Sequence, residues 1–265
     1  MTGNRLFQIG AALALLATLG FLAVPLAALF IDAGPGELIS SLGDPQAADA
    51  LWLSLRTSVA AVVIIVLVGT PAAYLLAMRA FRGRSLVLTL VELPLVLPPA
   101  AAGIALLAAF GPRGLLGGAI EDLGIRLVLE TAGVIVALIF VSTPFYVRGA
   151  IAAFESVDRD LLEASRTLGV GEAGTFARVA IPGAAAGLGA GLALAWGRAL
   201  GEFGATLLFA GSLQGVTQTA PLAIFEFLSR DFTASIALSA VLVVVSATLL
   251  LAVKLLVRLP DDARG

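Results

Sequence analysis

Six long apolar runs constrain this chain more than any other feature. A helix needs about 20 apolar residues to cross a hydrocarbon core, and runs of at least that order occur at 6–31, 57–78, 86–110, 131–149, 183–210 and 232–257. The chain is 60% hydrophobic and 13% charged, against roughly 25% charged in soluble domains. Barrel strands would alternate in polarity over about ten residues, which these runs do not. The sequence therefore predicts an all-α membrane protein with six transmembrane helices, built as one domain over 1–265.

The first run requires a choice between a cleaved secretory signal and a retained anchor. Arg5 precedes it, and small residues lie near Ala27 and Ala28. A signal core usually has about 7–15 apolar residues, and this run is nearly twice the upper figure. We therefore expect a retained anchor.

Basic residues in short loops stay on the cytoplasmic side of a membrane. With six spans, eleven of the 16 basic residues fall on one side. That side holds both termini and the polar segment 155–182, while the acidic segment after the first span falls on the other side. The sequence predicts a multi-pass protein of the inner (plasma) membrane with cytoplasmic termini.

The polar segment 155–182 is predicted to form two short helices. Asp158 can cap a helix over 159–168, and Gly169 and Gly171 can end it. A second helix over 172–179 would precede Pro182, and we expect this second helix to be the one that contacts a partner.

The same segment has a spacing that resembles a known motif. Glu163-Ala164-Ser165 is followed after three residues by Gly169, and after nine more by Val179-Ala-Ile-Pro182. This resembles the Glu-Ala-Ala (EAA) loop of permease subunits of bacterial ATP-binding-cassette (ABC) importers, with Ser165, Val179 and Ile181 as replacements of similar shape.

The resemblance implies a type I ABC importer permease fold whose EAA coupling loop, between spans four and five, docks on a separate ATPase. Thr175 and Phe176 are expected to form an exposed knob on the second helix, and Glu163 to fix the loop by pairing with an arginine or by capping. The residues expected to form the docking element are Glu163, Ala164, Ser165, Gly169, Gly171, Glu172, Thr175, Phe176 and Pro182.

Catalytic machinery is not evident in the chain itself. It has no Gly-x-x-x-x-Gly-Lys-Ser/Thr motif, and its only lysine is Lys254. It also has no histidine and no cysteine, which excludes the usual metal clusters and the common nucleophilic sites. We expect no cofactor and no metal in this chain, no nucleic-acid partner and no enzyme activity, with ATP and magnesium bound by the partner ATPase.

A second stretch bears on the substrate. Residues 199–206 read Ala-Leu-Gly-Glu-Phe-Gly-Ala-Thr, and residues 217–224 read Thr-Gln-Thr-Ala-Pro-Leu-Ala-Ile. This resembles permeases for molybdate and tungstate, and sulfate permeases share part of it. The resemblance implies uptake of an oxyanion, with sulfate, thiosulfate or phosphate as alternatives.

Charged residues inside a span are expensive and usually functional. Arg198 and Glu202 lie four apart on one helix face, where they can pair. Two interpretations stay open: a polar element of the anion pathway or its gate, or an ion pair that fixes helix packing. Glu92, in the third span, could instead partner Arg198. The residues expected along the pathway or gate are Glu92, Pro98, Arg198, Glu202 and Thr206.

Small residues and prolines suggest where helices pack or break. Gly183, Gly187 and Gly191 repeat every four residues, which favours close helix packing or a dimer seam. Prolines should break or kink the third span near Pro98 and the fourth at Pro144.

The sequence thus predicts an importer permease that pairs with a second copy in the bilayer. Two cytoplasmic ABC ATPases and an external substrate-binding protein would complete it. A different class, an ion-coupled secondary transporter, would use Glu92, Arg198 and Glu202 as an ion or proton relay.

Overall fold

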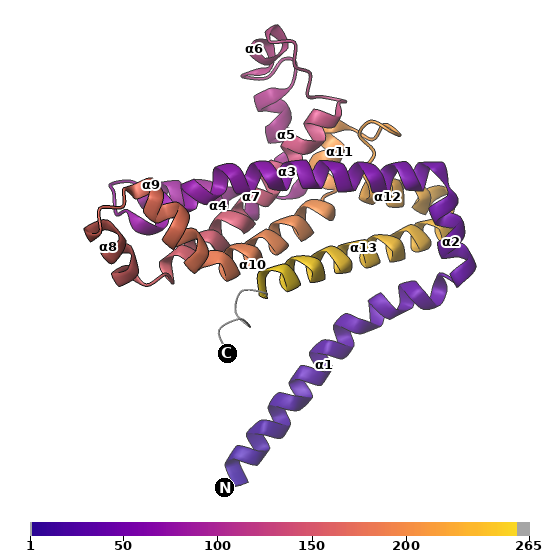
Figure 1. Ribbon diagram of the computed structural model, residues 1–265. Coiled ribbons are helices and arrows are strands. Elements are labelled where there is room, and N and C mark those ends of the chain that lie inside the picture. The colour runs from indigo at the N-terminus through magenta and orange to yellow at the C-terminus, as the bar shows by residue number, and fades with distance from the viewer. Residues whose placement is uncertain (1, 259–265) are drawn as a thin grey trace.

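A computed structural model describes residues 2–258, which form helices joined by turns and loops, with no strand among them. Four long helices form the body (Figure 1): α3 (Pro45–Met78), α7 (Thr131–Glu155), α10 (Ile181–Leu200) and α13 (Phe232–Arg258). α7 lies in the middle and packs against α3 and α10. The all-α prediction is confirmed.

Within residues 2–258, five helical segments are long and apolar enough to cross a membrane, and a sixth candidate is a bent pair. The pair is α4 (Arg84–Val96) and α5 (Pro99–Phe110), whose axes differ by 118°. The break lies at Leu97 and Pro98, where a helix cannot continue because Pro98 and Pro99 lack the N–H that it needs. The predicted break in the third span is confirmed.

Two predicted spans have different bounds. The second begins at Pro45 rather than residue 57, because Asp44 caps α3 by accepting the backbone N–H of Ala47 at 3.0 Å. The fifth does not run to residue 210: α10 ends at Leu200, and α11 (Gly204–Ala210) is a separate helix. α7 continues through Pro144, so the helix does not break there, and a kink at this position stays a prediction.

The helix α1 (Thr2–Asp32) diverges from the body along most of its length (Figure 1). Its most apolar window contains no buried residue, and it packs only near its end, where Leu29 and Ala33 contact α13.

The remaining elements are α2 (Pro35–Gly43), α6 (Gly117–Asp122), α8 (Arg159–Thr167), α9 (Glu172–Thr175), the π-helical turn η1 (Phe176–Ala180) and α12 (Ala220–Arg230).

The repeated glycines of α10, Gly183, Gly187 and Gly191, allow this helix to pack closely against α7. A Cβ on Gly187 would lie 2.5 Å from the Ala153 Cβ, and one on Gly149 would lie 2.9 Å from the Gly191 Cα. Only residues without a Cβ permit this approach. These glycines therefore pack within the chain, as the first of the two interpretations predicted, and not at a dimer seam.

Candidate functional site

The helix α8 lies at one end of the body, here called the α8 end (Figure 1). Asp158 accepts the backbone N–H of Asp160 at 2.9 Å and caps its start. Gly169 follows its end with φ of +82°, a conformation that suits glycine. The predicted first helix of the loop is confirmed, with its end at Thr167.

Two buried contacts hold α8 to the body. Leu162 is buried in the main apolar cluster, and the hydroxyls of Ser165 and Thr175 lie 3.0 Å apart. Thr175 is fully buried, and within the described part of the chain its hydroxyl has this one partner in place of water. The contact fixes the angle between α8 and α9.

The opposite face of α8 is open to solvent. Leu161 and Leu168 are 58% and 83% exposed, and Glu163 and Ala164 also face outward. Leu161 lies on α8 and Leu168 directly follows its last residue, and two large exposed apolar side chains so close together are typical of a surface that a protein partner covers.

The expectation for the second helix is wrong. The segment 172–179 is not a separate short helix, because α9, η1 and α10 run continuously from Glu172 to Leu200. Thr175 is buried, and the ring of Phe176 packs 4.8 Å from that of Tyr74 and 6.1 Å from that of Phe154, centroid to centroid. Burial of this aromatic cluster outweighs exposure of a knob. The freestanding short helix is α8.

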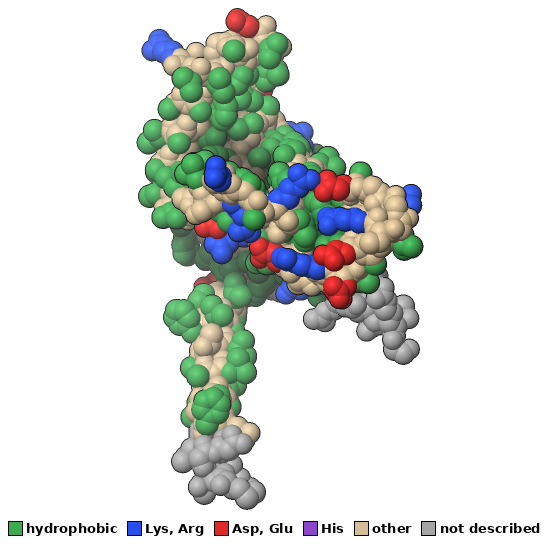
Figure 2. Space-filling model, turned by 90° about the vertical axis from the view of Figure 1, so that its left-hand side faces the viewer, with side chains coloured by type: hydrophobic (Ala, Val, Ile, Leu, Met, Phe, Trp, Pro, Cys, Tyr) green, Lys and Arg blue, Asp and Glu red, His purple; other side chains and the backbone are tan. Residues whose placement is uncertain are grey.

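Ion pairs surround the base of α8, and Figure 2 shows basic and acidic side chains gathered at this end against mostly hydrophobic flanks. Arg79 binds both carboxylate oxygens of Glu172 at 2.8 and 3.0 Å. Arg84 binds Glu155 at 2.9 Å and also donates its Nε–H to the Leu76 carbonyl at 2.7 Å. Glu163, expected to fix the loop, makes no ion pair or hydrogen bond through its side chain within 2–258. Glu172, at the start of α9, makes the ion pair with an arginine instead.

The expected pairing of the membrane-embedded charges is resolved. Arg198 pairs with Glu202, whereas Glu92 pairs with Arg148 on α7, with 3.2 Å between Oε1 and the arginine nitrogen. Of the two pairings left open, Arg198 with Glu202 is therefore the one present, and Glu92, which is 36% exposed, does not pair with Arg198. Sequence reasoning missed Arg148 because it was assigned to the helix end.

Glu202 lies at the joint between α10 and α11 and is 1% exposed. One carboxylate oxygen accepts the Arg198 guanidinium, and the other accepts the backbone N–H of Ala205 at 2.7 Å. Next to it, Thr206 is fully buried and its hydroxyl has no partner within the part of the chain described.

The broken third and fifth spans meet through small residues. A Cβ on Gly204 would lie 2.5 Å from the Pro99 Cβ, and a Cβ on Gly103 would lie 2.7 Å from the Leu208 Cβ. Ala102, Leu106, Ala205 and Phe209 form a shared apolar cluster with α7. Pro98, at the start of α5, is exposed, whereas Thr206 lies inside. The helices α5 and α11 thus pack as one unit.

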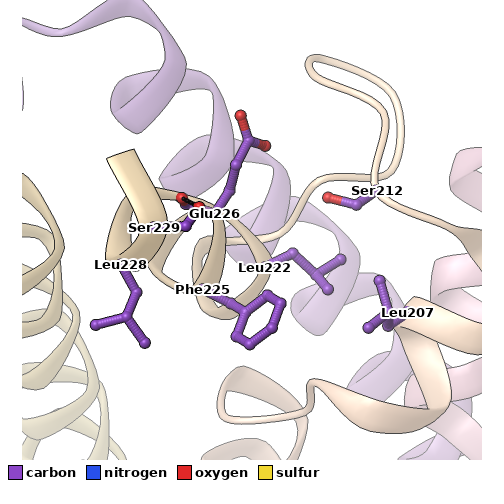
Figure 3. A pocket seen from close by; sticks show the side chains of 7 residues that line it. All are labelled: Leu207, Ser212, Leu222, Phe225, Glu226, Leu228 and Ser229. Atoms are coloured by element: carbon purple, nitrogen blue, oxygen red, sulfur yellow. Dashed lines mark hydrogen bonds between the residues drawn. The ribbon is translucent and has the colours of Figure 1, made fainter. Parts of the chain in front are cut away.

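The end opposite α8 carries a polar network that the sequence did not reveal. Gln218 is buried and bonds Gln46, at 2.9 Å, and Glu226, which pairs with Arg230 at 2.8 Å. Beside it lies a cavity of about 470 Å³ (Figure 3). Its lining residues are Leu207, Ser212, Leu222, Phe225, Glu226, Leu228 and Ser229. The one charged side chain of this lining is acidic, so the cavity does not suit an anion.

No group of acidic side chains within the described range has the arrangement of a metal site.

Comparison with known proteins gives a consistent result. Residues 69–262 match the family described as "Binding-protein-dependent transport system inner membrane component". The chain is 41% identical to the molybdenum transport system permease protein ModB of Mycobacterium tuberculosis, over 92% of each chain. It is 38% identical to the probable transport system permease protein NifC of Clostridium pasteurianum, over 90% of this chain and 83% of the relative.

A sulfate relative and a solved structure extend the comparison. The sulfate transport system permease protein CysW of Synechococcus elongatus is 37% identical over 73% of this chain and 68% of its own. A bacterial ABC transporter that imports the acidic polysaccharide alginate superposes with a TM-score of 0.75, over 96% of each chain and at 18% identity. At that identity the likeness concerns the fold.

Proposed function

Because the chain belongs to the binding-protein-dependent transport system inner membrane component family, we propose that it forms the translocation path of an ATP-driven importer for a tetrahedral oxyanion, with molybdate or tungstate as the substrate. Members of this family are the transport subunits of ABC importers. The molybdenum permease relative, at 41% identity over 92% of each chain, supports the substrate. Sulfate is the second candidate, favoured by the relative at 37% identity.

One observation carries the coupling part of the proposal. Leu161 on α8 and Leu168 directly after it are exposed on a mount held by the Ser165–Thr175 contact and the Arg79–Glu172 ion pair. A rigid mount with an apolar tip can transmit displacement, whereas a flexible loop would absorb it. We infer that α8, with Glu163, Ala164 and Gly169 around the tip, docks on a cytoplasmic ATPase that binds ATP and magnesium. Glu172, Thr175, Phe176, Gly171 and Pro182 would support it from behind.

The α8 end then faces the cytoplasm, and the α2 end faces the outside, where a substrate-binding protein delivers the anion. This orientation agrees with the distribution of arginines along the chain. The chain would lie in the inner (plasma) membrane with both termini cytoplasmic.

A second copy of the chain supplies the other half of the path. No residue of α4 is buried, and α1 leaves the body with its apolar side chains uncovered. Charged groups at membrane depth avoid lipid, yet Glu92 and Arg148 are 36% and 60% exposed. A homodimer would cover this charged face and leave a polar route between the copies. Two ATPases would then bind, one to each α8.

We infer alternating access as the mechanism. ATP would draw the two ATPases together and move the two α8 helices with them. The unit α5/α11 and its joint at Glu202, with Pro98 and Thr206 beside it, would then shift relative to α10. ATP changes the balance of the two states only through its different affinity for each.

Co-purification and calorimetry test the proposal. The tagged chain, extracted in detergent with its two partner proteins co-expressed, is expected to bring down the ATPase at one copy per chain. The binding protein should bind molybdate and tungstate at least tenfold more tightly than sulfate. Absence of the ATPase from the purified protein would contradict the coupling part of the proposal. A binding protein selective for sulfate would make sulfate the substrate in place of molybdate or tungstate.

A further inference from the structure

We propose that Arg148 is a binding residue for the transported oxyanion on the α8 side of the break in the third span, and that Glu92 competes with the anion for it. The proposal rests on the proposed import of an oxyanion. It concerns a pair that links α7 to α4, apart from the Arg198–Glu202 pair at the α10–α11 joint.

The position of Arg148 follows from the helix period. Ala137 and Val141 of α7 pack against α5 and α11. Arg148 lies seven residues after Val141, which is two helical turns, on nearly the same face and about 10 Å nearer the α8 end. The unit α5/α11 covers the first part of this face, whereas Arg148 and Ala152 remain exposed. Arg148 therefore lies just beyond the point where the broken span closes the face.

The pair with Glu92 is loosely held. A single nitrogen–oxygen contact of 3.2 Å joins the two side chains, and the Arg148 guanidinium makes no hydrogen bond within residues 2–258. Arg84, which joins the same two helices, instead makes two hydrogen bonds of 2.7 and 2.9 Å. A guanidinium has five N–H donors, so most of the Arg148 donors are available to a ligand.

This chemistry fits a tetrahedral dianion. Arginine binds planar or tetrahedral oxyanions through two parallel N–H donors. An uncompensated guanidinium would hold the anion too tightly for release, because transport requires binding weak enough to leave. Glu92 lies in reach to replace the anion at the guanidinium, so each departure restores the ion pair.

The lack of cysteine in the chain makes a direct test possible. Ala152→Cys places a thiol one turn from Arg148 on the same face. In the complete complex with its ATPase, we expect a membrane-impermeant anionic thiol reagent to label Cys at 152 from the cytoplasmic side. Millimolar molybdate should slow labelling at least threefold. Adding Arg148→Gln should abolish this protection. It should also slow labelling by the anionic reagent relative to labelling by a cationic thiol reagent.

Two further variants give opposite expectations. In Glu92→Gln, the molybdate concentration that protects Cys at 152 should be at least threefold lower, because the Glu92 carboxylate no longer competes for Arg148. The matched control Glu155→Gln removes a carboxylate between the same two helices and should leave the protection unchanged. In vesicles, Arg148→Gln should reduce uptake about tenfold, the usual effect of a lost charged hydrogen bond, with ATPase binding intact.

The failures are distinguishable. Wild-type vesicles that take up none of molybdate, tungstate, sulfate or phosphate would sink the proposed function itself. If the wild type takes up the anion but the Ala152→Cys variant is not labelled, this face of α7 contacts lipid or protein. That result would overturn the assignment of Arg148. Protection that persists in Arg148→Gln would overturn it as well.

Discussion

Arg198 and Glu202 join the end of α10 to the start of α11, because the Glu202 carboxylate accepts the Arg198 guanidinium on one side and the Ala205 N–H on the other. The carboxylate is 1% exposed and the guanidinium 29%. This arrangement favours the interpretation of the pair as a structural joint. We infer that it sets the angle at which the unit α5/α11 meets α10.

Removal of both partners of this joint should cost less stability than the two single removals added together. Glu202→Gln leaves Arg198 without a counter-charge and should lower stability by about 1–3 kcal/mol. Arg198→Gln with Glu202→Gln should cost less than the sum of the two single changes. Thermal unfolding of the detergent-solubilised variants measures this. Additive losses would show that the two side chains do not act together.

Close packing of α5 on α11 gives a second prediction. Gly204→Ala places a methyl group 2.5 Å from the Pro99 Cβ, and overpacking of this kind costs about 1–3 kcal/mol. We expect a lower melting temperature and slower uptake. Gly118→Ala is the matched control, since no atom lies within 4 Å of the added Cβ. Equal melting temperatures for the two variants would contradict the tight contact.

The contact between the Ser165 and Thr175 hydroxyls gives a third prediction. Ser165→Ala strands the fully buried Thr175 hydroxyl and should cost about 1–2 kcal/mol. Adding Thr175→Val removes the stranded group and should restore most of the loss. The melting temperatures of the single and double variants, measured side by side, decide the matter. A double variant less stable than Ser165→Ala would argue against this pairing.

Docking at the α8 end distinguishes the exposed Leu168 from Phe176, the residue that the sequence assigns to the docking element. Leu168→Asp should weaken ATPase binding at least tenfold and leave the melting temperature unchanged, since this side chain is 83% exposed. Phe176→Asp should instead destabilise the protein, because it puts a charge among Tyr74 and Phe154. Pull-down with the ATPase and unfolding of each variant form the test. A Phe176→Asp protein of normal stability that fails to bind would restore the original assignment.

Much of the fold could be predicted because a long apolar helix, and the glycine or proline that ends it, are recognised from residues that are neighbours in the sequence. The bounds of α8 followed from Asp158 and Gly169, and the break at Pro98 from its prolines. The break after Leu200 was missed because Gly201 and Gly204 read equally well as packing residues.

The site was less predictable because its contacts join residues far apart in the chain. The Glu92 partner depends on how α4 lies against α7, and the Gln46–Gln218 contact spans 172 positions. The expected exposure of Phe176 was wrong for the same reason, since Tyr74 is about a hundred residues earlier in the sequence. Hydropathy cannot tell an apolar residue on a partner surface from one in a distant aromatic cluster.

Uptake by vesicles tests the central claim most directly. The chain, reconstituted with its ATPase and supplied with the binding protein and labelled molybdate, should accumulate the anion only when ATP is present on the ATPase side. Excess tungstate should suppress this uptake. Accumulation by the chain alone, driven by an ion gradient without ATP or ATPase, would contradict the account and favour a secondary transporter.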